Sequence, residues 1–308
     1  MRGDWAWFKQ ALGLRGWTGE GPKGKICWLC RGAMHDDECY CCDFGIQAAW
    51  RRTSTTMADF WQEVLGAGQY ISPIWQIPDY LTSRCVPDFM HASWLGVVQY
   101  VNGNCMWELF REFGGNHNNW VRACGLLENM VSLSSRAMGV DSPLARLTVT
   151  MINPKANGKP KMKLIAADGR YFLKVLEHML GNLASRGSPH QRLRLQCVTA
   201  LVKAYKEIDA WQYDGSSALN IANHGYKHLL LYSELRNNSP DEKLWSLYPK
   251  HHMFAHVVSR CVANPKLEWN YSDESEIGLA AVVASVANQA SLETSLLSRY
   301  RAVFVAEC

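Results

Sequence analysis

Two pairs of residues suited to binding metal, far apart in the chain, place the strongest constraint on its fold. One pair is Cys27 and Cys30, separated by two residues, and the other is His252 and His256. A CxxC turn places two thiolates within reach of one Zn²⁺, and histidines at positions i and i+4 share one face of a helix. If one Zn²⁺ binds all four side chains, the two ends of the chain must lie side by side.

A local zinc site that uses the same CxxC is the alternative. His35 follows Cys30 after four residues, and a group of cysteines begins at Cys39. This spacing is close to the C-x2-C-x4-H-x4-C pattern of a zinc knuckle, but the fourth ligand position falls on Tyr40. The spacing therefore leaves open whether Cys27 and Cys30 are completed by the distant histidines or by His35 with Cys39 or Cys41.

Further candidate residues lie beside the histidine pair and near the start of the chain. His251 is adjacent to His252, but on a helix it points about 100° away from it. Asp4 precedes one helical pattern, and Asp273 and Glu274 open another. Acidic residues in such places commonly cap a helix or interact with its dipole. Considered with the zinc ligands, Asp4 and Glu274 are also candidates for binding a catalytic metal ion.

The pattern of hydrophobic residues predicts a mainly α protein. The chain has 308 residues, of which 48% are hydrophobic and 19% are charged, as in globular proteins. Hydrophobic residues recur at helical spacing between residues 46 and 245, without clear β alternation. The predicted helices cover residues 4–14, 48–65, 94–110, 116–151 with breaks at Gly125 and at 141–143, 164–180, 191–211 and 216–235.

Composition bounds the cellular setting. The sequence does not begin with an apolar leader, and its longest apolar run, residues 277–287, is too short to span about 30 Å of hydrocarbon. We therefore expect an intracellular protein, in which the 11 cysteines are thiols or metal ligands rather than disulfides. A net charge of +4 permits nucleic-acid binding without requiring it.

Two further segments are candidates for ligand contact. Asp88 follows Pro87 and precedes a long apolar run, so its expected role is to cap a helix, with His91 one turn further on. On its own this D-x-x-H pair is a weak metal signal. Residues 153–163 form a loop with four lysines, which is either a solvated surface or a contact for phosphate groups.

Taken in order, these features resemble the catalytic core of DDE/D-type cut-and-paste DNA transposases, especially the CACTA-like group and the related V(D)J recombinase core. In that family a CxxC follows the second catalytic acid, a large helical insertion comes next, and a histidine pair precedes the third acid. The sequence PKHHMFAH at residues 249–256 is similar to the family's P-K-x-H-x-x-x-H, and WNYSDESEIG at residues 269–278 is similar to its W-x-Y/F-x-x-E-x-x-x-G. DFMH at residues 88–91 is similar to the D-x-M-H of CACTA-like members.

The resemblance implies a role for each group of residues. It places the second acid on Asp4 and the third on Glu274, where Mg²⁺ or Mn²⁺ would bind. It places a structural Zn²⁺ on Cys27, Cys30, His252 and His256. An assignment with Asp88 as the middle acid conflicts with the family's order, in which CxxC follows the second acid. The activity implied is metal-dependent DNA cleavage and strand transfer in the nucleus, with DNA as the partner and a homodimer as a further expectation.

The resemblance also implies a domain organisation. Residues 1–45 would be a remnant of an RNase H-like α/β core with the CxxC, residues 46–245 an all-helical insertion, and residues 246–308 the histidine pair and a C-terminal acidic helix. Three residues precede Asp4, so we expect the strand that carries the first acid to be missing. We therefore expect a partial or decayed core that is inactive alone. The alternative is a non-catalytic zinc-binding helical module that binds DNA or protein.

Overall fold

The computed structural model describes residues 5–14, 24–66, 71–77, 85–116, 118–153, 158–185, 187–239 and 241–268. The chain divides into two compact units, residues 1–269 and 270–308, and all the described residues belong to the first. Asp4, Asp273 and Glu274 lie outside the described residues, as does the predicted C-terminal helix. The division into a core remnant, an insertion and a C-terminal segment stays a prediction.

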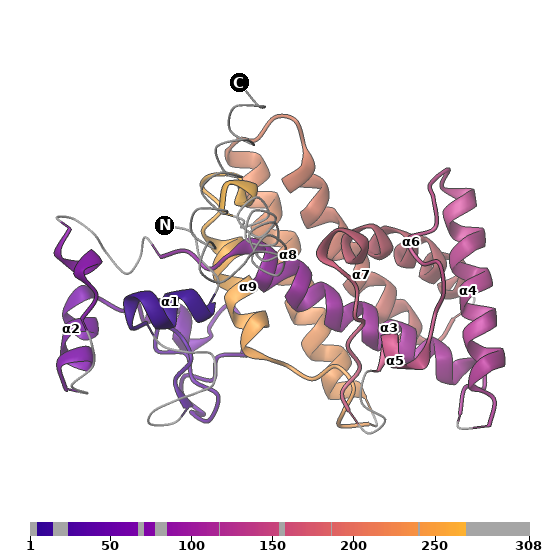
Figure 1. Cartoon of the computed structure of the whole chain (residues 1–308), viewed down its shortest axis with the longest axis horizontal. Coiled ribbons are helices and arrows are strands. Elements are labelled where there is room, and N and C mark those ends of the chain that lie inside the picture. The colour runs from indigo at the N-terminus through magenta and orange to yellow at the C-terminus, as the bar shows by residue number, and fades with distance from the viewer. Residues whose placement is uncertain are drawn as a thin grey trace, which may run out of the picture. The chain divides into compact units, whose positions relative to one another are not determined.

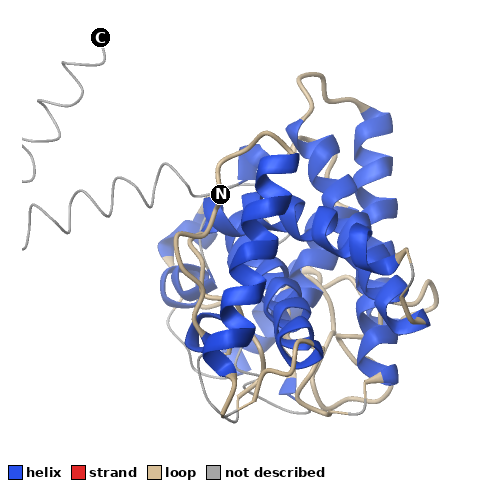
Figure 2. Cartoon of the chain, turned by 90° about the vertical axis from the view of Figure 1, so that its right-hand side faces the viewer, coloured by secondary structure: helices blue, strands red, loops and turns tan. Residues whose placement is uncertain are grey.

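The described residues are mainly helical, as predicted (Figures 1 and 2). In the ranges given above the only β pairing consists of isolated bridges, such as that between Cys30 and Ser54, and no strand is formed. The described residues therefore do not contain the β-sheet of an RNase H-like core. The elements are α1 (Trp5–Leu12), η2 (Ala49–Arg52), α2 (Met57–Gly66), η3 (Pro73–Gln76), η5 (Met90–Val98), α3 (Gln99–Glu112), α4 (Trp120–Ala137), α5 (Val149–Ile152), α6 (Ala166–Ala184), α7 (Pro189–Asp209), α8 (Gly215–Asn238), α9 (Pro249–Ser259) and η6 (Pro265–Glu268).

Two long helices, α7 and α8, form the centre of the helical region. Each begins with a side-chain cap, from Ser188 for α7 and from Asp214 for α8, which satisfies backbone N–H groups at the helix start. Helix α6 packs on α7, while α9 packs on α8 and also on η5. Leu201 and Leu229 are fully buried in this core. The histidine-bearing helix α9 is thus held between the central helices and η5.

The residues that lead into α9 are fixed by α3. Trp245 has a φ of 52°, in the left-handed region that a bulky residue rarely adopts. Its backbone N–H donates to Asn104 Oδ1 at 2.7 Å, and its indole Nε1 donates to Glu108 Oε1 at 2.7 Å. Glu108 is also paired with the fully buried Arg194 of α7, at 2.9 Å. This network sets the direction in which the chain enters α9.

The structure corrects two of the predicted helix boundaries. The single helix predicted for residues 48–65 is divided into η2 and α2, because Thr56 and Asp59 cap each other's backbone N–H groups and start a new helix at Met57. The break predicted at Gly125 is absent, since α4 continues through it. A glycine within a helix costs about 1 kcal/mol relative to alanine, which the packing of α4 tolerates.

Candidate metal centre and adjacent pocket

Cys27, Cys30, His252 and His256 form a buried cluster, in which the four ligand atoms all lie within 4.8 Å of one another. Cys27 Sγ is 3.4 Å from His256 Nε2, and Cys30 Sγ is 3.3 Å from His252 Nε2. The two Nε2 atoms are 3.1 Å apart. The residues that the sequence pairs across more than 200 positions are therefore brought together, and they could hold a metal ion such as zinc.

The geometry of this cluster fits a tetrahedral Zn²⁺. With Zn–S of about 2.3 Å and Zn–N of about 2.0–2.1 Å, the edges of a Cys₂His₂ tetrahedron are roughly 3.3–3.8 Å long, close to the separations observed here. The most exposed of the four side chains, His256, is only 5% exposed. Four protein ligands with no access for water are typical of a structural zinc site rather than a catalytic one.

Hydrogen bonds from neighbouring backbone groups orient His252 and favour negative charge on the two sulfur atoms, and both effects suit the binding of a cation. His252 Nδ1 is 2.7 Å from the carbonyl oxygen of Cys41, so it carries the proton and Nε2 keeps its lone pair for a metal. The backbone N–H groups of Leu29 and Gly32 donate to Cys27 Sγ and Cys30 Sγ, each at 3.3 Å. Such N–H donors stabilise negative charge on sulfur.

The two thiols differ in how readily they ionise. Burial raises the pKa of Cys27, but the hydrogen bond with Cys30 and the charges of the two histidines outweigh it and hold the pKa well below its ordinary value. The hydrogen bond with Cys27 and burial raise the pKa of Cys30. Without a metal, the cluster thus favours one thiolate and one thiol. Cys27 and Cys30 would both bind a Zn²⁺ as thiolates, and the proton of the remaining thiol would be released.

The local knuckle does not form among the residues that the structure describes. His35 and Cys39 are described, yet neither joins a group of three or more metal-binding side chains there. Cys41 contributes its carbonyl oxygen to His252 instead of its thiol to a metal. His251 faces away from the cluster: its ring packs beside Tyr232, with centroids 4.6 Å apart, and burial lowers its pKa to about 3.

Two neighbours of the cluster could not be recognised in the sequence. The ring of Trp50 packs edge-on against both histidines, with centroids 4.5 Å from His252 and 5.2 Å from His256. Gly32 lies so close that a Cβ atom there would be 2.8 Å from His252 Cε1 and 3.3 Å from Cys30 Sγ. No spacing rule links these residues to the ligands, because their proximity depends on how the loop folds over α9.

Helix α9 is also tied to the segment that contains the D-x-M-H sequence. The π-helix η5 is distorted at Gly96, where φ is −114° and ψ is −108°. Lys250 Nζ donates to the carbonyl oxygen of Leu95 at 2.7 Å. A Cβ atom on Gly96 would come within 3.2 Å of the Lys250 side chain, so the glycine gives that side chain room. Lys250, next to the predicted zinc ligands, thereby links the metal centre to η5.

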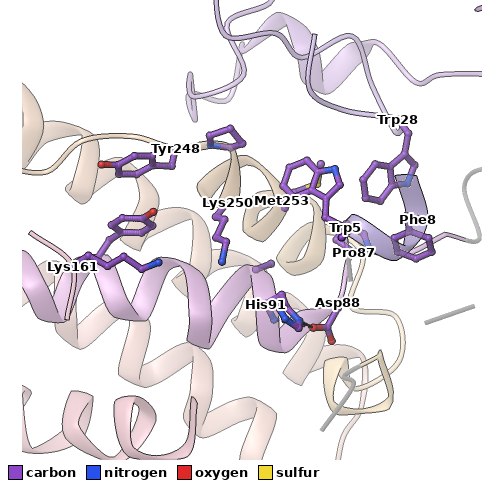
Figure 3. Close-up of a pocket in the computed structure, with 14 residues that line it drawn as sticks. Trp5, Phe8, Trp28, Pro87, Asp88, His91, Lys161, Tyr248, Lys250 and Met253 are labelled. Carbon is purple, nitrogen blue, oxygen red and sulfur yellow. Dashed lines mark hydrogen bonds and ion pairs between the residues drawn. The ribbon is translucent and has the colours of Figure 1, made fainter. Parts of the chain in front are cut away.

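Asp88 and His91 lie at the start of η5, as the sequence predicts. The Asp88 carboxylate accepts from the backbone N–H of His91 at 2.9 Å and lies 2.5 Å from His91 Nδ1. It therefore both caps the helix and orients the imidazole. In Figure 3 this pair lines a pocket of about 370 Å³, together with residues of α1, α9 and the lysine loop.

Comparisons of the chain with protein families, curated proteins and solved structures give no match. Across the ranges that are described, none of the helices combines the length and the apolar character that crossing a membrane requires. The function therefore has to be inferred from the metal centre and its surroundings.

Proposed function

We propose that this chain is the zinc-linked part of a DDE/D-type DNA transposase core, which in intact relatives cleaves DNA and transfers its strands. The single observation that supports this best is the proximity of Cys27 and His256, from opposite ends of a long helical region. In the family that the sequence resembles, the segment after the second acid and the helix before the third acid are joined in this way.

The role proposed for Zn²⁺ is structural. Cys27 follows Asp4 in the sequence, and His256 precedes Glu274. A metal bound by all four ligands would tie the loop that carries Cys27 and Cys30 to helix α9. Mg²⁺ or Mn²⁺ bound at such carboxylates activates a hydroxyl nucleophile and stabilises the leaving oxygen of a phosphoryl transfer. Hard oxygen ligands suit these ions, which is why acidic residues are assigned to them and not to zinc.

The proposal assigns two of the family's three acids to this sequence. The first acid is not assigned to a residue, and the RNase H-like sheet remains part of the proposal. We expect the chain alone to bind DNA and metal ions but not to complete strand transfer. Strand transfer by the chain alone that is lost in Glu274→Ala would contradict this last expectation.

A non-catalytic zinc-binding module remains the second candidate function. It differs in the ligands it predicts, because a self-contained knuckle would use His35 and Cys39 or Cys41 in place of the distant histidines. The cluster of Cys27 and Cys30 with His252 and His256 favours the first candidate.

The first test is the zinc content of the purified chain. We expect one Zn²⁺ per chain, lost in the double variant His252→Ala/His256→Ala. The matched control is His178→Ala/His224→Ala, which removes two histidines outside the cluster and should keep the metal. Zinc retained without the α9 histidines would favour the local knuckle and the module that binds without catalysis.

The second test concerns the two carboxylates. Fe²⁺ bound in place of Mg²⁺ reduces added hydrogen peroxide to hydroxide and a hydroxyl radical, which cuts the backbone near the ion, and ascorbate returns the Fe³⁺ to Fe²⁺. We expect cuts close to residues 4 and 274, reduced by excess Mg²⁺ and lost in Asp4→Ala or Glu274→Ala, while zinc content is unchanged. The absence of specific cuts in the zinc-loaded chain would contradict a shared metal site at these acids.

A further inference from the structure

The pocket beside the metal centre has the features of a ligand site. It encloses about 370 Å³ and is bounded by α1, η5, α9 and the residues around Lys161 (Figure 3). Neither the zinc cluster nor the proposed metal-binding acids, Asp4 and Glu274, account for the aromatic and lysine side chains that line this pocket. Pockets of this size with apolar walls and a few polar groups are typical of small-ligand sites.

Aromatic rings line the pocket at two places. On one side Trp28 packs against Trp5 and Phe8, with ring centroids 5.8 and 5.3 Å apart. On the other side the rings of Tyr100 and Tyr248 are stacked at 4.2 Å. Figure 3 shows Tyr248 on one side of Lys250 and Met253, and Trp28 and Phe8 on the other. Flat apolar walls of this kind suit a planar aromatic ligand.

Two lysines give the pocket a positive charge. Lys161 and Lys250 both line it, and within the described ranges neither forms an ion pair. Burial lowers the pKa of Lys161, and the Lys250 side chain also lines this partly enclosed space. An anion in the pocket would offset this unfavourable placement of two ammonium groups.

The position of Lys161 is set by the backbone. The N–H of Met162 donates to the carbonyl oxygen of Gln99 at 2.8 Å, and Gln99 Nε2 donates to the carbonyl oxygen of Leu164 at 2.9 Å. The same segment passes against Gly103 of α3, where a Cβ atom would be 2.6 Å from the Lys161 backbone. This end of the lysine loop is therefore held against α3, which directs Lys161 to the pocket.

We propose that this pocket binds one unpaired nucleotide of DNA, with the base between the aromatic walls and a phosphate at Lys161 and Lys250. His91, whose side chain is 28% exposed and is oriented by Asp88, supplies a polar group for the edge of the base. The proposal rests on the proposed function, which makes DNA the ligand. It adds a site that the metal-binding residues do not predict.

The test uses the full zinc-loaded chain and two fluorescent duplexes, one with a single bulged adenine and one with an abasic residue at that position. We expect the chain to bind the bulged duplex about 5- to 100-fold more tightly, the range that base stacking provides. Trp5→Ala should reduce this preference at least several-fold, whereas Lys161→Met removes a phosphate contact that both duplexes offer and should weaken the binding of both at least several-fold. Lys174→Met, at an exposed lysine of α6, is the matched control and should keep the preference.

A second measurement separates stacking in the pocket from general DNA binding. With 2-aminopurine as the bulged base, we expect quenching on binding, weakened in a Trp5→Ala chain that keeps its zinc and its circular dichroism spectrum. Equal affinity for the bulged and abasic duplexes would overturn the pocket proposal and leave the proposed function standing. Failure to bind any DNA would overturn both.

Discussion

The Nε2 atom of His252 lies 3.3 Å from the Sγ atom of Cys30, although 222 residues separate them in the chain. The contact joins a loop near the start of the sequence to helix α9. A contact between residues so distant in sequence closes a long loop, which costs conformational entropy. A bound Zn²⁺ would oppose that cost, because binding to the folded site stabilises the folded state.

Removal of the metal is therefore expected to lower stability. Treatment of the zinc-loaded chain with a strong chelator should reduce its Tm by several degrees or more, and added Zn²⁺ should restore it. Replacement by Co²⁺ should give the visible absorption of a tetrahedral ion with thiolate ligands, since two cysteines and two histidines are available. A Co²⁺ spectrum typical of six-coordinate oxygen ligation would contradict the site.

Gly32→Ala should weaken metal binding. The new Cβ atom would be 2.8 Å from His252 Cε1, so the loop or the imidazole has to shift. We expect at least a tenfold loss of zinc affinity, measured by competition with a chromogenic chelator. Gly125→Ala is the control, because a Cβ there meets nothing within 4 Å. That change should leave zinc affinity unaltered and raise the free energy of unfolding by up to about 1 kcal/mol.

Lys250→Met tests the link between α9 and η5. Methionine keeps an unbranched stem but loses the hydrogen bond to the Leu95 carbonyl oxygen. Leaving that carbonyl without its partner should reduce the free energy of unfolding by about 1–3 kcal/mol, as read from urea denaturation. Zinc stoichiometry should not change. The exposed Lys174→Met variant should stay within about 0.5 kcal/mol of the unmodified chain, and equal effects of the two changes would refute the link.

The Glu108 network predicts a dependence of stability on pH. The hydrogen bond with Glu108, 3.0 Å away, raises the pKa of His190 above 6.5. A raised pKa stabilises the folded state below pH 6.5, and this stabilisation is lost as the pH rises through the folded-state pKa. For Glu108, burial favours the neutral acid, but His190 and Arg194 lower its pKa overall, so its contribution is lost in acid.

His190→Gln should therefore lower Tm at about pH 6 and have a smaller effect at about pH 9. The shift should be modest, because the His190 side chain is 32% exposed and solvent weakens the interaction. His178→Gln, at a partly exposed histidine of α6 whose ring contacts Asn182, is the control for the loss of an imidazole by itself. A difference between His190→Gln and the unmodified chain that stays constant across this range would rule out the predicted linkage.

Several features could be predicted because they depend on residues close together in the sequence. Hydrophobic periodicity predicted most of the helices, since one face of each is buried on the core. The role of Asp88 as a cap followed from its place before an apolar run, and the structure confirms it. The division between η2 and α2 was missed, although the Thr56–Asp59 pair carried a local signal for it.

The sequence by itself determined which side chains could bind zinc, because CxxC and an i, i+4 histidine pair each fix two ligands through local backbone geometry. It left open whether Cys27 and Cys30 bind the metal with His252 and His256 or with His35 and a nearby cysteine. Only the tertiary structure decided that, by packing α9 between α8, η5 and the CxxC loop. The same holds for Trp50, Gly32 and the Lys250 contact with Leu95. Contacts between distant segments depend on how every intervening helix packs, and a short sequence motif does not specify this packing.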